Sequence, residues 1–264
     1  MGAVLLARDT AGNGREVALK TLALEQSFRG TELAEARQCF RREAEAAARL
    51  RHADIVTVFD AGEDQGLAYI AMERLHGHDL QTHTQASTLL PLPILLRVVA
   101  RVADALAYAH RQGVLHRDVK PANVMVDLDA DCVKLTDFGI ARFSAAERTR
   151  TGLLVGTPSY LSPEQLLGQR PDGRSDLYAL GVTLFQLLCA RLPHEDVSMA
   201  GLMRQVAGQP APDLRTLRPE LPAALATLVA RMLEKAPERR PADGREVALE
   251  LRQLADRIDP AAAP

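Results

Sequence analysis

Two short stretches decide how this chain folds: His116-Arg117-Asp118-Val119-Lys120-Pro121-Ala122-Asn123 and, further along, Asp137-Phe138-Gly139. Together they supply two carboxylates and an amide, whose oxygen atoms are the ligands that a hard cation such as Mg²⁺ prefers. Short turns that contain aspartate are common on protein surfaces, so neither stretch carries an interpretation alone. Both stretches in this order are hard to attribute to chance, and they predict one site built from the two.

Composition limits the class of protein. The chain has 264 residues, of which 47% are hydrophobic and 25% charged, as in an ordinary globular protein. Its 32 basic and 34 acidic residues leave a formal charge of -2, so no overall field favours nucleic acid. Three isolated cysteines, Cys39, Cys132 and Cys189, fit a reducing compartment. No apolar run approaches the ~18 residues that span a bilayer. We therefore expect a cytoplasmic segment without nucleic-acid binding or a membrane span.

The first part of the chain predicts strands with one inserted helix. Short apolar runs predict strands at 4–7, 17–22, 55–59 and 67–72, joined in pairs by glycine-containing turns at 11–14 and 61–66. Between the pairs, apolar residues recur at helical spacing, which predicts an amphipathic helix over 28–50.

After Gly77 the pattern becomes helical. A long helix is predicted over 92–110, and Arg97, Arg101 and Asp104 argue against its crossing a membrane. Prolines separate further predicted helices at 175–188, 200–206, 222–233 and 244–254. The expected architecture is α+β with two lobes: a strand-rich lobe over 1–75, a larger helical lobe over 76–258, and the start of a linker over 259–264.

The two opening stretches resemble the catalytic-loop and metal-binding signatures of protein kinases, H-R-D-x-x-x-x-N and D-F-G. The lysine two residues after Asp118 resembles the serine/threonine branch, and Phe40-Arg41-Arg42-Glu43-Ala44 resembles the bacterial form of the family's small-lobe helix. The resemblance covers 2–254. It implies a two-lobed protein-kinase-like fold, with ATP and Mg²⁺ as cofactors. By this resemblance Asp118 is the catalytic base, Lys120 binds the γ-phosphate, and Asn123 and Asp137 are the metal ligands.

A lysine in the second predicted strand fits the same family. Val17-Ala18-Leu19-Lys20 resembles V-A-I-K, whose lysine contacts the α- and β-phosphates and pairs with a glutamate of the next helix. We expect Glu43 as that partner, because Glu45 lies about 200° further around the helix. Only four of the 32 basic residues are lysines. Lys20 and Lys120 fall where the mechanism requires a compact ammonium group rather than a planar guanidinium.

The resemblance also implies a nucleotide-base pocket. In 71–75 Met72 corresponds to the gatekeeper, and the backbone carbonyl of Glu73 and amide of Leu75 would hydrogen-bond adenine. The base would lie between three apolar side chains, those of Val4, Ala18 and Met125. Gly2 aligns with the third glycine of the glycine-rich loop, whose amides cover the phosphates.

The segment after Asp137 resembles a kinase activation segment. Residues 156–164 are similar to the G-T-P-x-Y and A-P-E sequences at its end, a platform for peptide substrates, which favours a protein over a small molecule as phosphate acceptor. Thr149 and Thr151, with Ser144 behind them, are the expected sites of autophosphorylation, within a homodimer, and Arg117 would bind the new phosphate.

Three further residues are expected to have structural roles. The resemblance implies that Glu164 and Arg240 form a buried salt bridge. It also implies that Asp176, at the start of a helix, anchors the catalytic loop.

The start of the chain departs from the family pattern, since the first two loop glycines and the strand before them are absent. Either the true start lies upstream or the chain is a trimmed fragment, and fewer phosphate-binding amides would lower its activity. The expected parent protein continues beyond Pro264, where a membrane anchor would fit.

The leading interpretation is an ATP- and Mg²⁺-dependent serine/threonine protein kinase with protein substrates. Two alternatives stay open. One is a catalytically impaired pseudokinase that binds nucleotide or partner proteins, and the other is a small-molecule kinase of the aminoglycoside type, which the 140–164 segment disfavours.

Overall fold

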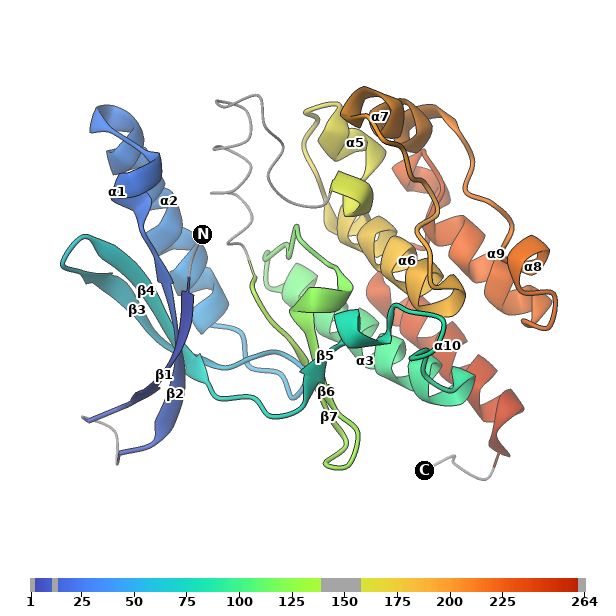
Figure 1. Ribbon diagram of the computed structural model, residues 1–264, viewed down its shortest axis with the longest axis horizontal. Helices are drawn as coiled ribbons and strands as arrows, with labels where there is room; N and C mark the ends of the chain where they lie inside the picture. Colours follow the sequence, from blue (N-terminus) through green and yellow to red (C-terminus); the bar gives the residue numbers. More distant parts are fainter. Residues whose placement is uncertain (1–2, 11–13, 139–157, 261–264) are drawn as a thin grey trace.

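The computed structural model describes residues 3–10, 14–138 and 158–260 (Figure 1). A smaller lobe built on a sheet stands beside a larger, mainly helical lobe, which confirms the expected α+β, two-lobed architecture. Gly2, the middle of the predicted 11–14 turn, and the expected phosphorylation sites Ser144, Thr149 and Thr151 lie outside the described residues.

The small lobe has an antiparallel sheet in the order β1-β2-β4-β3. Its strands are β1 (Ala3–Arg8), β2 (Glu16–Leu22), β3 (Val58–Asp64) and β4 (Leu67–Glu73). Lys20 of β2 lies opposite Val4 of β1 and Ile70 of β4, and Ala18 lies opposite Met72. Because side chains alternate along a strand and direct cross-strand partners share a face, all of these side chains lie on one face of the sheet.

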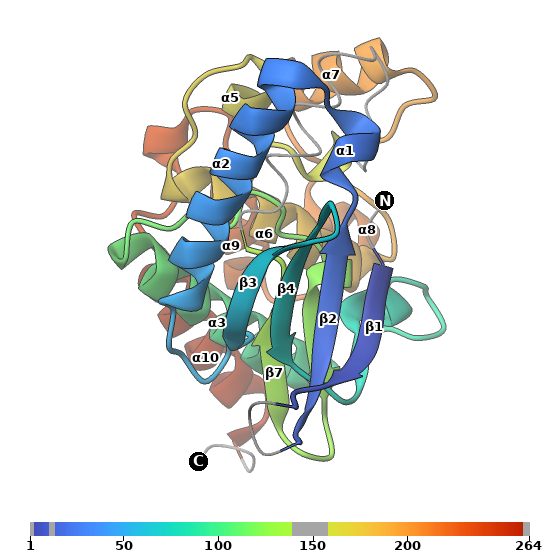
Figure 2. The same cartoon turned by 90° about the vertical axis from the view of Figure 1, so that its left-hand side faces the viewer.

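Two helices accompany this sheet, α1 (Leu24–Ser27) and α2 (Gly30–Ala48) (Figure 2). Three apolar residues of α2 that recur at helical spacing are buried: Phe40, Ala44 and Ala47. The helix predicted over 28–50 is therefore confirmed in its main part, with a separate short helix before it.

The third strand differs from its prediction over 55–59. Ile55 forms a parallel bridge with Leu135, and the backbone N–H of Val56 donates to Leu135 O at 3.0 Å. This apolar run is thus paired with a distant part of the chain, and β3 begins only at Val58. The hairpin turn is also tighter than predicted, because Gln65 and Gly66 with φ of 48° and 78° make the reversal.

A second, three-stranded sheet lies where the lobes meet, in the order β5-β6-β7 (Figure 1). It consists of β5 (His78–Asp79), β6 (Val124–Asp127) and β7 (Cys132–Leu135). The sequence predicted a predominantly helical region here and none of these strands, because strands of two to four residues give too short a pattern to detect. Two turns of 3₁₀-helix flank these strands, η1 (Leu80–His83) and η2 (Pro121–Asn123).

The large lobe is built around α3 (Leu92–Arg111), which packs along α10 (Gly244–Ile258) and against α6 (Gly173–Cys189). The remaining helices are α5 (Pro163–Leu166), α7 (Met199–Gly208), α8 (Leu214–Leu217) and α9 (Ala223–Met232), with 3₁₀ turns η3 (Pro158–Tyr160) and η4 (Pro237–Arg239). The predicted apolar face of α3 is buried, and the predicted helices are confirmed within a few residues at their ends. Within the described ranges, no helix is both long and apolar enough to span a bilayer.

A buried ion pair fastens α5 to the end of the large lobe. Glu164 accepts hydrogen bonds from Nη1 and Nη2 of Arg240 at 2.7 and 2.8 Å, and the Arg240 guanidinium lies 4.9 Å from the Tyr178 ring centroid. The predicted Glu164–Arg240 salt bridge is confirmed. Burial opposes ionisation of Glu164, but hydrogen bonds from Arg240 and Ser175 outweigh it and lower the carboxyl pKa to about 2.

Candidate active site

The candidate site lies between the two lobes, where β2 of the small lobe faces the end of β7. Lys20 Nζ and Asp137 Oδ1 are 2.7 Å apart, and both side chains are half-buried. Thr136 links this pair to the catalytic loop, since its backbone N–H donates to Asn123 O at 2.9 Å. Lys20, Asn123 and Asp137 thus come together from three segments that are distant in the sequence.

The catalytic loop holds its polar side chains against one another. Asp118 Oδ2 accepts hydrogen bonds from Lys120 Nζ at 2.7 Å and from Asn123 Nδ2 at 3.0 Å. The same Asn123 Nδ2 donates to the Asp118 carbonyl at 2.7 Å. Since the amide nitrogen of Asn123 is committed to Asp118, its Oδ1 is the atom that remains for a cation.

Asp176 of α6 holds the backbone of the catalytic loop in place. Its Oδ2 accepts the N–H of His116 at 2.9 Å and its Oδ1 accepts the N–H of Arg117 at 2.7 Å, while His110 Nε2 lies 2.8 Å from Oδ2. Burial raises the Asp176 pKa, but the hydrogen bond and charge of His110 outweigh burial and lower it. Arg117 has φ of 67°, a strained value for a residue with a side chain, which this clamp stabilises. The anchoring role predicted for Asp176 is confirmed.

His116 connects the catalytic loop to the segment that carries Asp137. Its Nδ1 accepts the N–H of Asp118 at 3.2 Å, and its Nε2 lies 2.7 Å from Thr136 O. Nδ1 is therefore the acceptor, and Nε2 carries the proton. Burial lowers the pKa of His116, which favours this neutral ring. The ring also packs edge-on against Phe138, with centroids 4.6 Å apart.

Glu43 and Lys20, the predicted ion pair, have different partners in the structure. Glu43 Oε1 is 2.8 Å from Arg117 Nη1, whereas Lys20 is paired with Asp137. The expected Lys20–Glu43 pairing is thus absent, and each of these two side chains forms an ion pair with another residue.

The side chains expected around adenine belong to strands of both sheets. Val4, Ala18 and Met72 share the Lys20 face of the small sheet, and Met125 of β6 is the direct partner of Lys134 across the second sheet. Met72 is buried, whereas Val4 remains 61% exposed. Glu73 and Leu75 continue the chain from β4 toward the large lobe and are half-buried. A small cavity of about 20 Å³ is lined by Lys20, Val58, Ile70, Met72, Asp137 and Phe138 among others.

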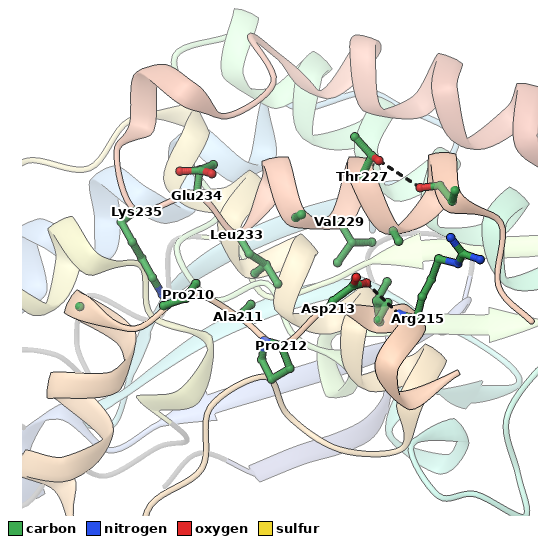
Figure 3. A pocket seen from close by; sticks show the side chains of 15 residues that line it. Pro210, Ala211, Pro212, Asp213, Arg215, Thr227, Val229, Leu233, Glu234 and Lys235 are labelled. Carbon is green, nitrogen blue, oxygen red and sulfur yellow. Dashed lines mark hydrogen bonds between the residues drawn. The ribbon is translucent and has the colours of Figure 1, made fainter. Parts of the chain in front are cut away.

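A wider cavity of about 520 Å³ lies within the large lobe, between the loop before α8 and helix α9 (Figure 3). Asp213 in its wall accepts the N–H of Arg215 and so caps α8. Lys235, at the other end, lies 3.1 Å from His194 Nε2, and burial lowers the His194 pKa to about 4, so that a neutral ring accepts this hydrogen bond. The cavity contains none of the predicted site residues.

The donor set suits Mg²⁺ held jointly with phosphates. Among the described residues, no group of three or more His, Cys, Asp or Glu side chains could hold a metal alone. Asn123 and Asp137 supply an amide and a carboxylate oxygen on adjacent segments. Because Mg²⁺ in phosphoryl-transfer sites is bound through one or two carboxylates plus substrate phosphates and water, this pair fits the ion.

Such a cleft, with an ammonium, two carboxylates and an amide between a small sheet and a helical lobe, is that of a nucleotide-dependent phosphotransferase. The protein kinase domain model matches residues 1–252. The chain therefore belongs to the protein kinase domain family. Membership implies ATP as the phosphate donor, typically with Mg²⁺.

Similar proteins come from several bacteria. The serine/threonine-protein kinase PksC of Streptomyces coelicolor is 44% identical over 256 residues, which are 91% of this chain and 44% of the relative. Serine/threonine-protein kinase pkn3 of Myxococcus xanthus is 38% identical over 91% of this chain and 46% of its own length. The crystal structure of the Mycobacterium tuberculosis PknI kinase domain superposes with a TM-score of 0.75 at 34% identity, covering 96% of this chain and 91% of that one. The chain spans less than half the length of these curated relatives.

Sequence reasoning missed two features of the site. The Arg117–Glu43 pair joins side chains from different lobes, and no pattern along the chain signals it. The second feature is the ion pair of Lys134 with Glu73. Lys134 is one of only four lysines in the chain, and this scarcity is the signal that could have marked it as a candidate.

Proposed function

We propose that this chain is a serine/threonine protein kinase that transfers the γ-phosphate of ATP to hydroxyl groups of proteins. The observation that carries the proposal is the convergence of Lys20, Asp118, Asn123 and Asp137 around one cleft. The names of the bacterial relatives support the serine/threonine specificity. Residues 1–75 and 76–258 would then be the two lobes of one catalytic domain, with 259–264 beginning a linker.

Asp118 is the proposed catalytic base, which orients the acceptor hydroxyl and takes its proton. Its contacts support this role, because Lys120 and Asn123 hold the carboxylate in one orientation. Lys120, 2.7 Å from Asp118, would be positioned to stabilise negative charge on the transferred phosphate.

The remaining polar residues would bind the nucleotide and its metal. Asn123 and Asp137 would hold Mg²⁺, and Lys20 and Gly2 would bind phosphate oxygens. When bound, Mg²⁺ neutralises phosphate charge and aligns the transferred group. For this to occur Lys20 must exchange Asp137 for phosphate, and Glu43 would then stabilise the ammonium.

The nucleotide base would be held by apolar side chains and the backbone of the inter-lobe segment. Val4, Ala18 and Met125 would contact its two faces, and Met72 would close the back of the pocket. The carbonyl of Glu73 and the amide of Leu75 would bind its edge.

Autophosphorylation between two copies of the chain is the proposed mode of activation. Arg117 is occupied by Glu43 at 2.8 Å, and a phosphate on Thr149, Thr151 or Ser144 would compete for the same guanidinium. Such competition would release Glu43 toward Lys20.

The test is transfer from γ-labelled ATP with Mg²⁺ to a protein acceptor. We expect Asp118→Asn to bind ATP as the unmodified chain does and to transfer phosphate at least about a thousandfold more slowly. Transfer by Asp118→Asn at the unmodified rate would contradict the assignment of the base.

A pseudokinase is the second candidate function, and the mutual pairing of the site charges favours it. Lys20 and Glu43 are each bound to another protein group rather than to one another. ATP binding by the unmodified chain without any transfer, to itself or to an added protein, would establish this alternative.

A further inference from the structure

The segment between the lobes carries an ion pair that the proposed mechanism does not use. Lys134 Nζ of β7 donates to Glu73 Oε1 at 2.7 Å and lies 3.4 Å from Ile55 O. The same Glu73 Oε1 accepts the backbone N–H of Thr57 at 2.7 Å, and the N–H of Glu73 donates to Thr57 O at 2.9 Å. One carboxylate therefore joins the end of β4, the segment before β3 and strand β7.

Burial makes this contact stronger than a surface ion pair. The Lys134 and Glu73 side chains are 15% and 25% exposed. Exposed pairs contribute little, but a sheltered carboxylate that accepts both an ammonium and a backbone N–H has little freedom to turn. The position of the Glu73 backbone is consequently restrained by the hydrogen bonds of its side chain as well as by the hydrogen bond of its own amide.

The residue type at this position is informative. The chain uses arginine for 28 of its 32 basic residues. Most of the other ion pairs among the described residues contain arginine. A guanidinium is larger and planar, whereas an ammonium can contact Glu73 and the Ile55 carbonyl within one small space. The ammonium group of Lys134, with three hydrogen-bond donors on a single nitrogen, therefore suits this position better than a guanidinium group would.

The location of the pair connects it to the nucleotide. Glu73 supplies the carbonyl proposed to bind the adenine edge, and Met125, proposed to contact the adenine face, is the cross-strand partner of Lys134. Asp137, the proposed metal ligand, follows Lys134 by three residues. The β6–β7 hairpin and the residues directly after it thus carry the groups proposed to contact the base and the metal.

We propose that Lys134 is a positioning residue for nucleotide recognition, which acts through Glu73 to hold the adenine-binding backbone in place. The inference rests on the proposed function, because it requires that adenine bind along the Glu73–Leu75 backbone. It assigns to Lys134 a role in affinity and base selectivity rather than in phosphate transfer.

The test is a comparison of Mg-ATP and Mg-GTP binding by isothermal titration calorimetry. We expect Lys134→Met to raise the dissociation constant for ATP about tenfold. The dissociation constant for GTP should change less than about twofold. Guanine has a carbonyl group where adenine has the amino group that would donate a hydrogen bond to the Glu73 carbonyl. The turnover rate at saturating ATP should stay within about twofold, since no group touching the phosphates changes.

A second variant separates positioning from folding. Glu73→Gln keeps an oxygen for the Thr57 N–H and removes the charge, so it should reproduce the loss of ATP affinity without a large fall in melting temperature. If the two residues act as one unit, the double variant should bind ATP no more weakly than Lys134→Met alone. Lys235→Met is the matched control, because it removes another partly buried lysine within the large lobe and should leave ATP binding unchanged.

Several outcomes would overturn the inference. Equal weakening of ATP and GTP, or no change in either, would make the pair merely structural while leaving the proposed function intact. A faster turnover with unchanged ATP affinity would make it a restraint on movement of the lobes. An unmodified chain that binds no nucleotide would remove both the inference and the proposed function.

Discussion

Strand β1 of the small lobe and helix α6 of the large lobe are both apolar in sequence, but they differ in how much of their side-chain surface is exposed to solvent. Val4, Leu5 and Leu6 of β1 are 61%, 52% and 62% exposed, whereas Tyr178 and Phe185 of α6 have no exposed surface. β1 lies at the edge of its sheet and pairs on one side only, while α6 packs among η3, α3, α8 and α9.

This difference follows the division of labour in the proposed site. Helix α6 supplies Asp176, which holds the catalytic loop through two backbone hydrogen bonds. Strand β1 supplies Val4, whose side chain remains available to a ligand. The catalytic loop is therefore anchored to the core, whereas Val4, which is proposed to cover the base, lies on an edge strand.

The largest effect is expected from the core of α6. Phe185→Ala should lower the free energy of unfolding by about 3–5 kcal/mol, because it removes a fully buried aromatic ring and leaves a cavity. Urea unfolding followed by circular dichroism measures this change. A loss below about 1 kcal/mol would show that α6 is not the rigid element that the comparison requires.

The next effect concerns pH and the Glu164–Arg240 pair. The folded-state pKa of Glu164 is about 2, below its ordinary value of 4.5, so its contribution to stability is complete above pH 4.5 and is lost as pH falls toward 2. Glu164→Gln should therefore be less stable than the unmodified chain by about 3 kcal/mol at pH 7, with the gap narrowing below pH 4.5.

Unfolding curves at several pH values measure this gap. Glu220→Gln is the control: its carboxylate pairs with Arg218 at the surface, and its curve should follow that of the unmodified chain. A gap for Glu164→Gln that stays constant down to pH 2 would contradict the assigned pKa.

Asp176→Asn should lower the turnover rate about a hundredfold, equal to about 2.7 kcal/mol. The amide would place a donor against backbone donors that now bind a carboxylate, so the catalytic loop would lose its position. Asp172→Asn on the same helix is the matched control, because Asp172 is an N-cap and asparagine caps equally well. Equal losses in the two variants would indicate a general effect on α6.

The smallest effect is expected on β1. Val4→Ala should raise the dissociation constant for ATP about three- to fivefold, because it removes apolar contact with the base, and should leave the melting temperature unchanged. Leu5→Ala alters the opposite face of the same strand and should change neither quantity. Similar weakening by both variants would mean that β1 affects binding through its backbone.

Much of the fold follows from local patterns. Strands β1, β2 and β4 and helices α2, α3, α6 and α10 have periodic apolar residues, and the sequence predicted each of them near its observed bounds. The start of β3 and the strands β5 to β7 could not be predicted in the same way. Ile55 is apolar enough for a strand, but its partner is Leu135, and such pairing between distant residues leaves no periodic signal.

The sequence alone determined which chemical groups are present. The order of Asp118, Asn123 and Asp137 predicted the catalytic loop and its metal ligands. The small number of lysines indicated positions where the proposed mechanism uses an ammonium group. Only the tertiary structure decided which charges meet. Lys20 lies against Asp137, Glu43 against Arg117 and Lys134 against Glu73. Ion pairing depends on separation in space, which the packing of the two lobes sets and which spacing along the chain does not encode.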